Sequence, residues 1–498
     1  MNFSDIVDIG AARHPAHEAI RVGDRALDFA ELRARSLKVT GLLLDAGVER
    51  GDTVGVVLCN ALEFAEIAFG IMGAGAVFVP VNTRLAAAEM TYVLDHAEVT
   101  LIFHGEEFSP TIEQIRPNLP GVRGTYIVGS SCDAALAEAP AADSFTEMGP
   151  DEDCMIVYTS GTTGSPKGVV RSHSSGMWAA SNFTTTFGHF PYGDDRFLYT
   201  IPLASIGFAN IFCGCLFAGM TVELMYSFDS DEALRIIQEH KVTHTYFVPS
   251  MWRMILAADH ARRDTSSLRV GIWGGERMDA ALREAIIARF GGVLVGVFGM
   301  TEGAMSSARL GNDETRPRTC GRAAGYNQFR IVDDDGVEVP RGTVGEIINK
   351  SPTTLSRYFK DEKATRETLR NGWLHTGDLG SMDEEGYLSV VDRKKEMLIS
   401  GGQNVYPAEI EQALKQHVAV AAAAVIGVAD ERWGEAGMAF VVPSGPTPPS
   451  AQELAEYTRT LLARYKVPKH WRFVDELPTN ANGKVRKVQL REWAKRDA

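Results

Sequence analysis

The decapeptide Thr159-Ser-Gly-Thr-Thr-Gly-Ser-Pro-Lys-Gly168 decides how the rest of this chain is interpreted. Its glycines let the backbone aim several N–H groups at one anion, its hydroxyl side chains add donors, and Lys167 adds a positive charge. The preceding stretch Cys-Met-Ile-Val-Tyr (154–158) predicts a buried strand, so the loop is expected at a strand's C-terminal end, where α/β proteins bind ligands. The decapeptide therefore predicts a phosphate-binding loop, with the candidate residues Thr159, Ser160, Gly161, Thr162, Thr163, Gly164 and Lys167.

A Walker P-loop is the obvious comparison for this loop. That pattern needs Gly-Lys followed by Ser or Thr, whereas here Pro166 precedes Lys167 and Gly168 follows it. The Walker interpretation therefore fails. A solvated loop rich in Ser, Thr and Gly is the plain alternative, and the apolar pair Val169-Val170 that follows argues against it.

Composition bounds the fold and the function. At 498 residues the chain exceeds what one hydrophobic core usually serves, so at least two domains are expected. The formal net charge of −14 argues against nucleic acid as the main partner. No apolar run approaches the roughly 18 residues that suggest a membrane span. The first residues are acidic where a secretory signal would be basic, so we expect a cytoplasmic protein with no transmembrane segment.

The order of strand and helix patterns predicts an α/β fold. Strand candidates alternate with helical patterns in the first part of the chain, which predicts βαβ units and a mainly parallel sheet. After about residue 318 the sequence changes to Gly-rich strands separated by turns, which predicts a small antiparallel or barrel-like subdomain. A last segment has its own strands and helices. The strand candidates are residues 53–59, 77–81, 101–104, 124–128, 221–225, 242–248, 270–273, 293–298, 328–332, 345–349, 387–391, 421–428 and 438–442.

A second polar cluster, Phe298-Gly-Met-Thr-Glu-Gly303, follows an apolar strand. It puts a hydroxyl beside a carboxylate after a glycine turn. Oxygen ligands suit a hard cation such as Mg²⁺, which usually shares its shell between one or two carboxylates and substrate phosphates. Taken alone, Gly-x-Thr-Glu could instead be a helix N-cap with an acidic residue in the first turn.

Together the two clusters resemble those of the adenylate-forming superfamily of acyl-CoA synthetases, luciferases and peptide-synthetase adenylation domains. The decapeptide matches the signature loop nearly residue for residue, and Phe298–Glu302 is similar to the motif Tyr-Gly-x-Thr-Glu. The resemblance covers essentially the whole chain. It implies a large N-terminal part, residues 1–392, with parallel αβ subdomains and a small β-barrel-like subdomain, which binds ATP and the acid. It also implies a small, mobile α+β lid domain, residues 393–498.

The resemblance also implies roles for residues of the second cluster. In the superfamily the aromatic ring stacks on adenine, the threonine meets the α-phosphate and the glutamate holds Mg²⁺, here Phe298, Thr301 and Glu302. Phe298 keeps the stacking surface of the usual tyrosine but lacks its hydroxyl. Further nucleotide-binding candidates by the same resemblance are Gly275, Glu276 and Gly299.

Motifs nearer the C-terminus match the superfamily as well. In Gly372–Gly380 the resemblance implies that Asp378 binds the ribose hydroxyls, and a tight turn capped by that aspartate is the alternative. Arg393 matches an arginine that contacts ribose and phosphate. Lys395 matches the hinge about which the small domain reorients.

The last two matching motifs concern the chemistry itself. Lys484 matches the lysine that stabilises negative charge while the carboxylate attacks the α-phosphate. Gly401 and Gly402 match glycines that pass close to the pantetheine arm of CoA. The plain alternative is a glycine turn before a helix that has Pro407 in its first turn, and the two interpretations are compatible.

Departures from the family pattern concern the acid. Ala204 and Ser205 stand where many members carry an aromatic residue or His, and Trp273 stands where a small Ser or Thr is usual. A large indole could shorten the acid pocket or pack underneath it. The acid could be fatty, aryl or short and branched, and the residues expected to line its pocket are Ser205, Phe208, Trp273 and Gly274.

The resemblance implies an AMP-forming acid–CoA ligase that uses ATP, Mg²⁺ and CoA on a small carboxylic acid. The nearer rivals are an adenylation enzyme that loads a carrier protein and a luciferase-like oxygenase on the same scaffold. A rival of another class, a non-enzymatic nucleotide-binding regulator, would need neither the CoA-facing glycines nor Lys484. The sequence leaves room for a homodimer.

Overall fold

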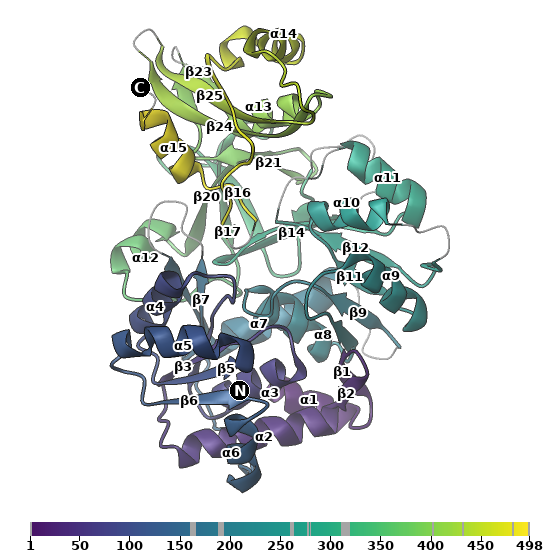
Figure 1. Ribbon diagram of the computed structural model, residues 1–498, viewed down its shortest axis with the longest axis vertical. Coiled ribbons are helices and arrows are strands. Elements are labelled where there is room, and N and C mark those ends of the chain that lie inside the picture. Colours follow the sequence, from purple (N-terminus) through teal and green to yellow (C-terminus); the bar gives the residue numbers. More distant parts are fainter. Residues whose placement is uncertain are drawn as a thin grey trace. The chain divides into compact units, whose positions relative to one another are not determined.

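The computed structural model describes residues 2–159, 166–187, 194–258, 263–275, 278, 280–309, 319–400, 403–430, 433–480 and 483–496 (Figure 1). The chain folds into two compact units that are interleaved in sequence. The first is made of described residues up to 328 together with 349–374, and the second of 329–348 and 375–496. The boundary after residue 392, between a large N-terminal part and a mobile lid domain, stays a prediction. Every helix within the described ranges is too short or too polar to cross a bilayer.

The first unit contains a seven-stranded sheet, in the order β18-β8-β7-β4-β3-β5-β6. Its central strands pair in parallel, as the alternation of strands and helices predicted, while β7 with β8 and β8 with β18 are antiparallel. The strands are β3 (Thr53–Val57), β4 (Val77–Pro80), β5 (Leu101–Gly105), β6 (Gly124–Val128), β7 (Asp153–Thr159), β8 (Lys167–Ser172) and β18 (Arg357–Tyr358).

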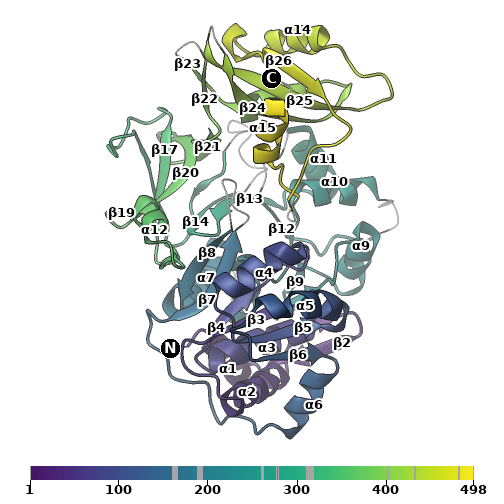
Figure 2. The same cartoon turned by 60° about the vertical axis from the view of Figure 1, so that its left-hand side comes forward.

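Helices cover both faces of this sheet because alternate residues of its strands point in opposite directions. Phe78 of β4 packs in a core with α2 and α3, whereas its neighbours Val77 and Val79 pack in a second core with α4 and α5. Figure 2 shows α4 and α5 lying over the strands. The helices of this part are α1 (Asp5–Arg13), α2 (Phe29–Asp45), α3 (Leu62–Gly73), α4 (Ala87–His96), α5 (Ser109–Ile115), α6 (Ser131–Glu138) and the short η1 (Glu106–Phe108) and η2 (Arg116–Asn118).

A nine-stranded sheet completes the first unit, in the order β15-β14-β13-β12-β11-β9-β10-β1-β2. Its inner strands are parallel, so their C-terminal ends meet at one edge, and antiparallel hairpins close the sheet at both sides. The sequence did not indicate the N-terminal hairpin. The strands are β1 (Glu18–Val22), β2 (Arg25–Asp28), β9 (Arg196–Tyr199), β10 (Thr221–Leu224), β11 (His244–Tyr246), β12 (Val270–Trp273), β13 (Leu294–Met300), β14 (Gly303–Arg309) and β15 (Arg322–Ala323).

Further helices pack on this second sheet. The segment Cys213-Gly-Cys215 begins a short buried helix in the core. All six cysteines are free thiols. The helices are α7 (His173–Phe187), η3 (Phe208–Phe212), α8 (Cys213–Phe217), α9 (Ser230–Glu239), α10 (Pro249–Ala257) and α11 (Ala280–Phe290). Helix α12 (Glu362–Thr368) comes later in the chain, and the strand β19 (Leu369–Arg370) that follows it pairs antiparallel with residues 373–374 of a different sheet.

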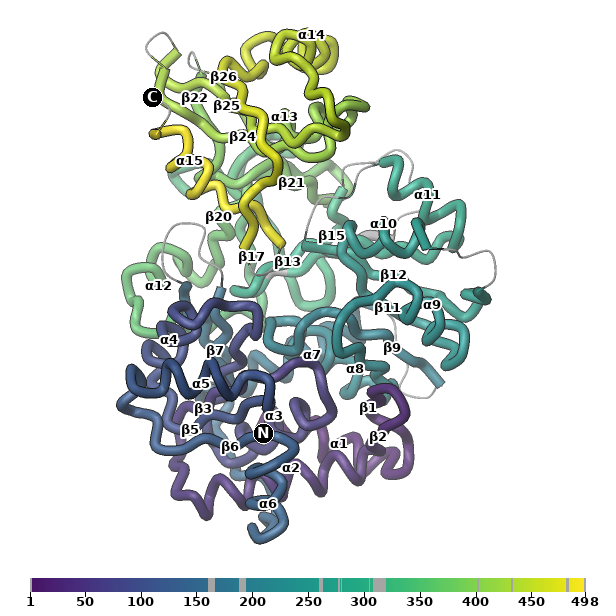
Figure 3. The backbone as a smooth tube through the Cα atoms, in the orientation of Figure 1, coloured from purple at the N-terminus to yellow at the C-terminus, as the bar shows by residue number. Residues whose placement is uncertain are grey.

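The second unit combines two sheets. In one, β16, β17 and β20 are neighbours and β21 pairs antiparallel with β20; in the other, α13 and α14 pack on one face and α15 on the opposite face. Figure 3 traces its long paired strands β24 and β25. The elements are β16 (Gln328–Val332), β17 (Gly345–Lys350), β20 (Trp373–Met382), β21 (Leu388–Arg393), β22 (Leu398–Ser400), β23 (Gln403–Val405), α13 (Pro407–Leu414), β24 (Val420–Asp430), β25 (Gly434–Pro443), α14 (Ala451–Leu461), η5 (Arg464–Lys466), β26 (His470–Phe473) and α15 (Lys487–Arg496). The predicted α/β fold with a smaller α+β part is confirmed.

A buried histidine ties the N-terminus to the first residue of α7. The Phe3 N–H donates to Nδ1 of His173 over 2.9 Å, and both side chains are fully buried. Burial lowers the pKa of His173 to about 4, because a second proton would need water or a partner and Nδ1 already accepts this bond. The His173 ring is therefore neutral in the folded protein at neutral pH.

This linkage predicts acid sensitivity of the first unit. The pKa of His173 is lower in the folded protein than the unfolded value of 6.5. The unfolded chain therefore binds the proton more tightly, and stability should fall as the pH drops from about 6.5 to 4, by up to about 3 kcal/mol. Chemical denaturation at several pH values measures this. An asparagine at this position keeps an acceptor but does not titrate, so H173N should make the free energy of unfolding less dependent on pH between about 6.5 and 4. If the pH dependence of H173N runs parallel to that of the wild type, the assignment to His173 is wrong.

Candidate functional site

The segment predicted to bind phosphate connects β7 and β8, which pair as antiparallel neighbours. Thr159 pairs with Lys167, so the segment follows the C-terminal end of β7, as the sequence predicted. Thr159 and Lys167 are half-buried. Eight predicted site residues lie outside the described ranges, namely Ser160, Gly161, Thr162, Thr163, Gly164, Glu276, Gly401 and Gly402.

The second cluster forms the end of the β13–β14 hairpin. Met300 pairs with Gly303, so Thr301 and Glu302 make up its two-residue turn. The alternative of a helix N-cap is therefore wrong. The predicted adenine-binding pair Phe298 and Gly299 lies on the same hairpin, next to the turn.

Contacts from distant segments hold this turn. The Leu355 N–H donates to the Glu302 carbonyl over 2.7 Å, and the Tyr358 hydroxyl donates to Glu302 Oε1 over 2.7 Å. Nη2 of Arg171 donates to the Thr301 carbonyl over 2.8 Å. Neither Tyr358 nor Arg171 belonged to the predicted site. No motif pointed to Tyr358, whose strand is two residues long.

Lys167 joins the same group through the ring of Tyr358. Its Nζ lies 4.9 Å from the ring centroid, where the negative face of the ring attracts a cation. Burial and the neighbouring Glu302 carboxylate raise the pKa of Tyr358, so the phenol stays protonated and can donate. The structure therefore brings together the predicted residues Lys167, Thr301 and Glu302.

The predicted acid-pocket residues differ in their surroundings. Trp273 ends β12 and is half-buried, and a Cβ atom placed on Gly296 of the next strand would lie 3.0 Å from its indole. Gly274 follows it, and a Cβ there would lie 2.9 Å from the Val297 carbonyl. Ser205 uses its hydroxyl in a local turn, donating to the Pro202 carbonyl over 2.7 Å.

Phe208, which was predicted to line the acid pocket, lies in the apolar core. Its side chain is fully buried, stacks on Phe212 at 5.5 Å and packs with Phe64, Phe69 and Phe78. Packing accounts for Phe208 without a ligand.

In the second unit the two predicted ribose contacts meet. Asp378 and Arg393 are paired across β20 and β21, and Arg393 Nε lies 2.7 Å from Asp378 Oδ1. The Asp378 side chain is 7% exposed and that of Arg393 50% exposed, so the carboxylate is buried while the guanidinium group reaches solvent. Because Asp378 lies within a strand, its interpretation as the cap of a tight turn is wrong.

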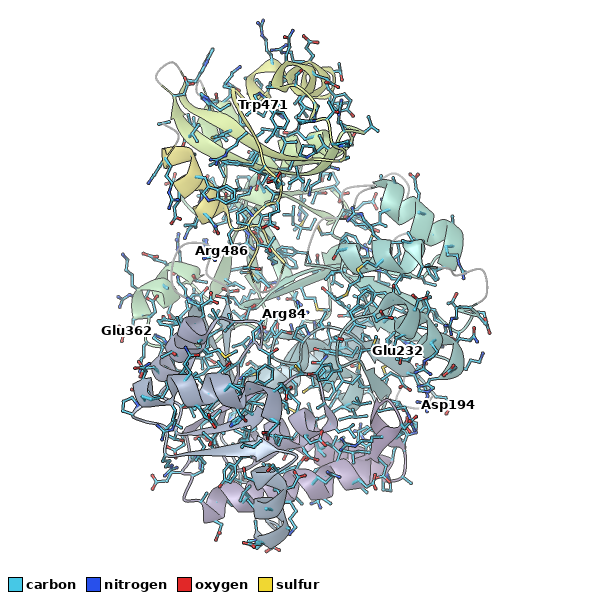
Figure 4. All side chains as sticks on the ribbon, in the orientation of Figure 1. Arg84, Asp194, Glu232, Glu362, Trp471 and Arg486 are labelled. Atoms are coloured by element: carbon cyan, nitrogen blue, oxygen red, sulfur yellow. The ribbon has the colours of Figure 1, made fainter. Side chains whose placement is uncertain are left out.

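The predicted hinge and catalytic lysines are both exposed. Lys395 follows β21 in a turn in which the N–H groups of Glu396 and Met397 donate to the Arg393 carbonyl. Lys484 lies in a tight hairpin, where its N–H donates to Asn480 Oδ1 over 2.9 Å. Arg486, labelled in Figure 4, closes the hairpin through its N–H, which donates to the Pro478 carbonyl over 2.7 Å.

Comparisons with known proteins agree with these motifs. The family model of the AMP-binding enzyme matches residues 7–359, and that of the AMP-binding enzyme C-terminal domain matches residues 409–484. A feruloyl-CoA synthase from an Amycolatopsis species is 36% identical over 485 residues, 97% of this chain and 96% of the relative. The long-chain-fatty-acid–CoA ligase FadD13 of Mycobacterium tuberculosis is 36% identical over 474 residues, 94% of this chain and 93% of that protein.

A solved structure has the same fold. The o-succinylbenzoate CoA synthetase MenE from Bacillus subtilis, in complex with its acyl-adenylate intermediate, matches with a TM-score of 0.89 and 31% identity. The match covers 98% of this chain and 97% of that one. The chain therefore belongs to the family of AMP-binding, adenylate-forming acyl-CoA ligases, and it is an ATP-dependent acid–thiol ligase that forms an acyl-adenylate and then a CoA thioester.

Proposed function

We propose that this ligase activates a compact aryl carboxylic acid, and that Lys167, Thr301 and Glu302 receive the phosphates of ATP. One observation supports the phosphate site above others: Tyr358 contacts Lys167 through its ring and Glu302 through its hydroxyl, and Lys167 belongs to the predicted phosphate loop. A cation and a carboxylate at that point are the groups that ATP with Mg²⁺ requires.

Mg²⁺ fits the donors at this turn. Within the described ranges no group of three or more His, Cys, Asp or Glu side chains is arranged to hold a metal ion. Glu302 would therefore supply the protein carboxylate, and phosphate oxygens would complete the shell, as is usual for this ion. When bound, Mg²⁺ neutralises negative charge on the phosphates.

The first half-reaction is proposed to use groups from both units. A carboxylate oxygen of the acid attacks the α-phosphorus of ATP, the bond to pyrophosphate breaks, and the acyl-adenylate forms. Lys484 would stabilise the negative charge that grows on the α-phosphate, without transferring a proton. Phe298 would stack on adenine, while Asp378 and Arg393 would bind the ribose.

In the second half-reaction the sulfur of CoA attacks the acyl carbonyl and AMP leaves. Rotation at Lys395 would exchange the adenylating arrangement for a thioester-forming one, which keeps water from the mixed anhydride. Gly401 and Gly402 would then approach the pantetheine arm. These roles rest on the family resemblance, as does the mobile lid domain 393–498. A homodimer is a further part of the proposal.

Trp273 supports an aryl acid. Its indole lies against Gly296 at the edge where the parallel strands end, so it fills space that a smaller residue would leave to the acid. A flat aromatic wall stacks well on a planar ring and limits the length of an alkyl chain. The relatives include both an aryl and a long-chain fatty acid ligase, so the family alone does not decide between these acids.

The role of Lys484 is tested by Lys484→Ala. The residue is exposed, so the fold should survive, and losing its charge should slow acid-dependent pyrophosphate release by about 10²-fold or more. Lys415→Ala, at another exposed lysine of the same unit, serves as the control. Wild-type release rates in a folded Lys484→Ala protein would refute the assignment.

The acid class is tested by Trp273→Ala, assayed with benzoic and octanoic acids. Removing the indole should raise the ratio of kcat/KM for octanoic over benzoic acid by about 10-fold or more, because the pocket gains length and loses its stacking wall. Trp178→Ala, at an exposed tryptophan of α7, should leave the ratio unchanged. An unchanged ratio in Trp273→Ala would mean that the indole only packs beneath the pocket.

A further inference from the structure

The turn that carries Thr301 and Glu302 needs support from outside its own hairpin. The ladder of β13 and β14 ends at the pair Met300 and Gly303, so it does not fix the side chains of the turn. Both turn residues are half-buried. Their direction depends on the segments that contact them, and β8 and β18 supply such contacts.

Tyr358 is suited to direct the carboxylate of Glu302. Its backbone is held against β8, where it pairs with Val169, and the next N–H, of Phe359, donates to the Gly168 carbonyl over 2.7 Å. Its hydroxyl donates to Oε1 of Glu302. Because this partner is a neutral phenol, it orients the carboxylate while leaving its negative charge for a cation.

Tyr358 also couples Glu302 to the phosphate loop. Its ring lies under the ammonium group of Lys167, which begins the strand that pairs with β18. The same side chain thus contacts a group proposed to bind the metal ion and a group proposed to bind phosphate. A displacement of Tyr358 would change the spacing between these two charges.

Arg171 holds the other residue of the turn. Its side chain is 1% exposed, and it donates from Nη2 to the Thr301 carbonyl. Nε and Nη1 have no hydrogen-bond partner within the described residues. Burial lowers the pKa of Arg171 to about 10, so the guanidinium stays charged at neutral pH.

A buried cation with unsatisfied donors is a poor choice for stability alone, because an apolar side chain of similar size avoids the desolvation cost. The same charge is useful beside a polyanion, since low dielectric strengthens its attraction for phosphate. The placement of Arg171 therefore favours a functional reason.

We infer that Tyr358 and Arg171 are positioning residues for this reaction: Tyr358 aims the Glu302 carboxylate, Arg171 fixes the Thr301 carbonyl, and together they set the affinity for ATP with Mg²⁺. This inference rests on the proposed role of Glu302. Neither residue needs to touch the substrate: both act through the turn, and the buried charge of Arg171 also attracts phosphate through space.

Binding measurements separate positioning from a general effect on the fold. Calorimetric titration with ATP at a series of Mg²⁺ concentrations gives the Mg²⁺ concentration for half-maximal binding, and thermal denaturation reports the fold. Tyr358→Phe keeps the ring beneath Lys167 and removes only the hydroxyl. It should raise that Mg²⁺ concentration about 10-fold, as expected for a lost hydrogen bond to a charged group. ATP binding in excess EDTA should stay unchanged.

Arg171→Met should weaken ATP binding about 10-fold with and without Mg²⁺, and Arg171→Lys should restore part of it, because the charge returns. Tyr126→Phe, in the same unit but on β6, is the control and should bind like the wild type. If Arg171→Met does not fold, Tyr358→Phe alone decides.

Glu302→Gln distinguishes failure of this inference from failure of the proposed function. A shifted Mg²⁺ dependence in Glu302→Gln with a wild-type curve in Tyr358→Phe would overturn the inference and leave the metal site intact. A wild-type curve in Glu302→Gln would overturn both.

Discussion

Strand β8 is paired along both edges, and the candidate site depends on that double pairing. On one edge β7 brings Thr159 opposite Lys167 and closes the phosphate loop; on the other, β18 places Tyr358 beside Val169. Because the side chains of a strand alternate between faces, a shift of one residue in β18 would turn Tyr358 away from Glu302. The register of a two-residue strand thus controls which groups meet at the loop.

The parallel order of the nine-stranded sheet supplies the other half of the geometry. Parallel strands end at a common edge: Tyr246 pairs with Ile272, and Trp273 pairs with Gly296 of β13, the strand that leads to the turn. Ligands of open parallel sheets bind beyond the C-terminal ends of the strands, so this edge is the expected place for binding. The proposed acid residue Trp273 and the turn of Thr301 and Glu302 therefore belong to this sheet, while Lys167 comes from the seven-stranded sheet.

The sequence predicted the elements that have a strong local signal. Continuous apolar runs such as 270–273 gave strands with the observed bounds, and the glycine-rich decapeptide marked the loop. Asp378 was ambiguous, because the Gly and Thr beside it favour turns while long-range pairing with β21 imposes a strand. Tyr358 and Arg171 carried no signal, since their roles arise only when distant segments meet: Tyr358 and Glu302 are 56 residues apart, and Arg171 and Thr301 are 130 apart.

Arg171 and Lys484 carry their charges in different surroundings. Arg171 is buried in a sheet of the first unit, whereas Lys484 is exposed on a hairpin of the second unit whose backbone is fixed by Asn480. Within the second unit, the sheet of β22 to β26 has an apolar core whose members all follow Lys395 in the chain. Rotation at Lys395, the proposed hinge, would leave that core intact, so the proposed movement of Lys484 toward and away from the α-phosphate would cost little packing energy.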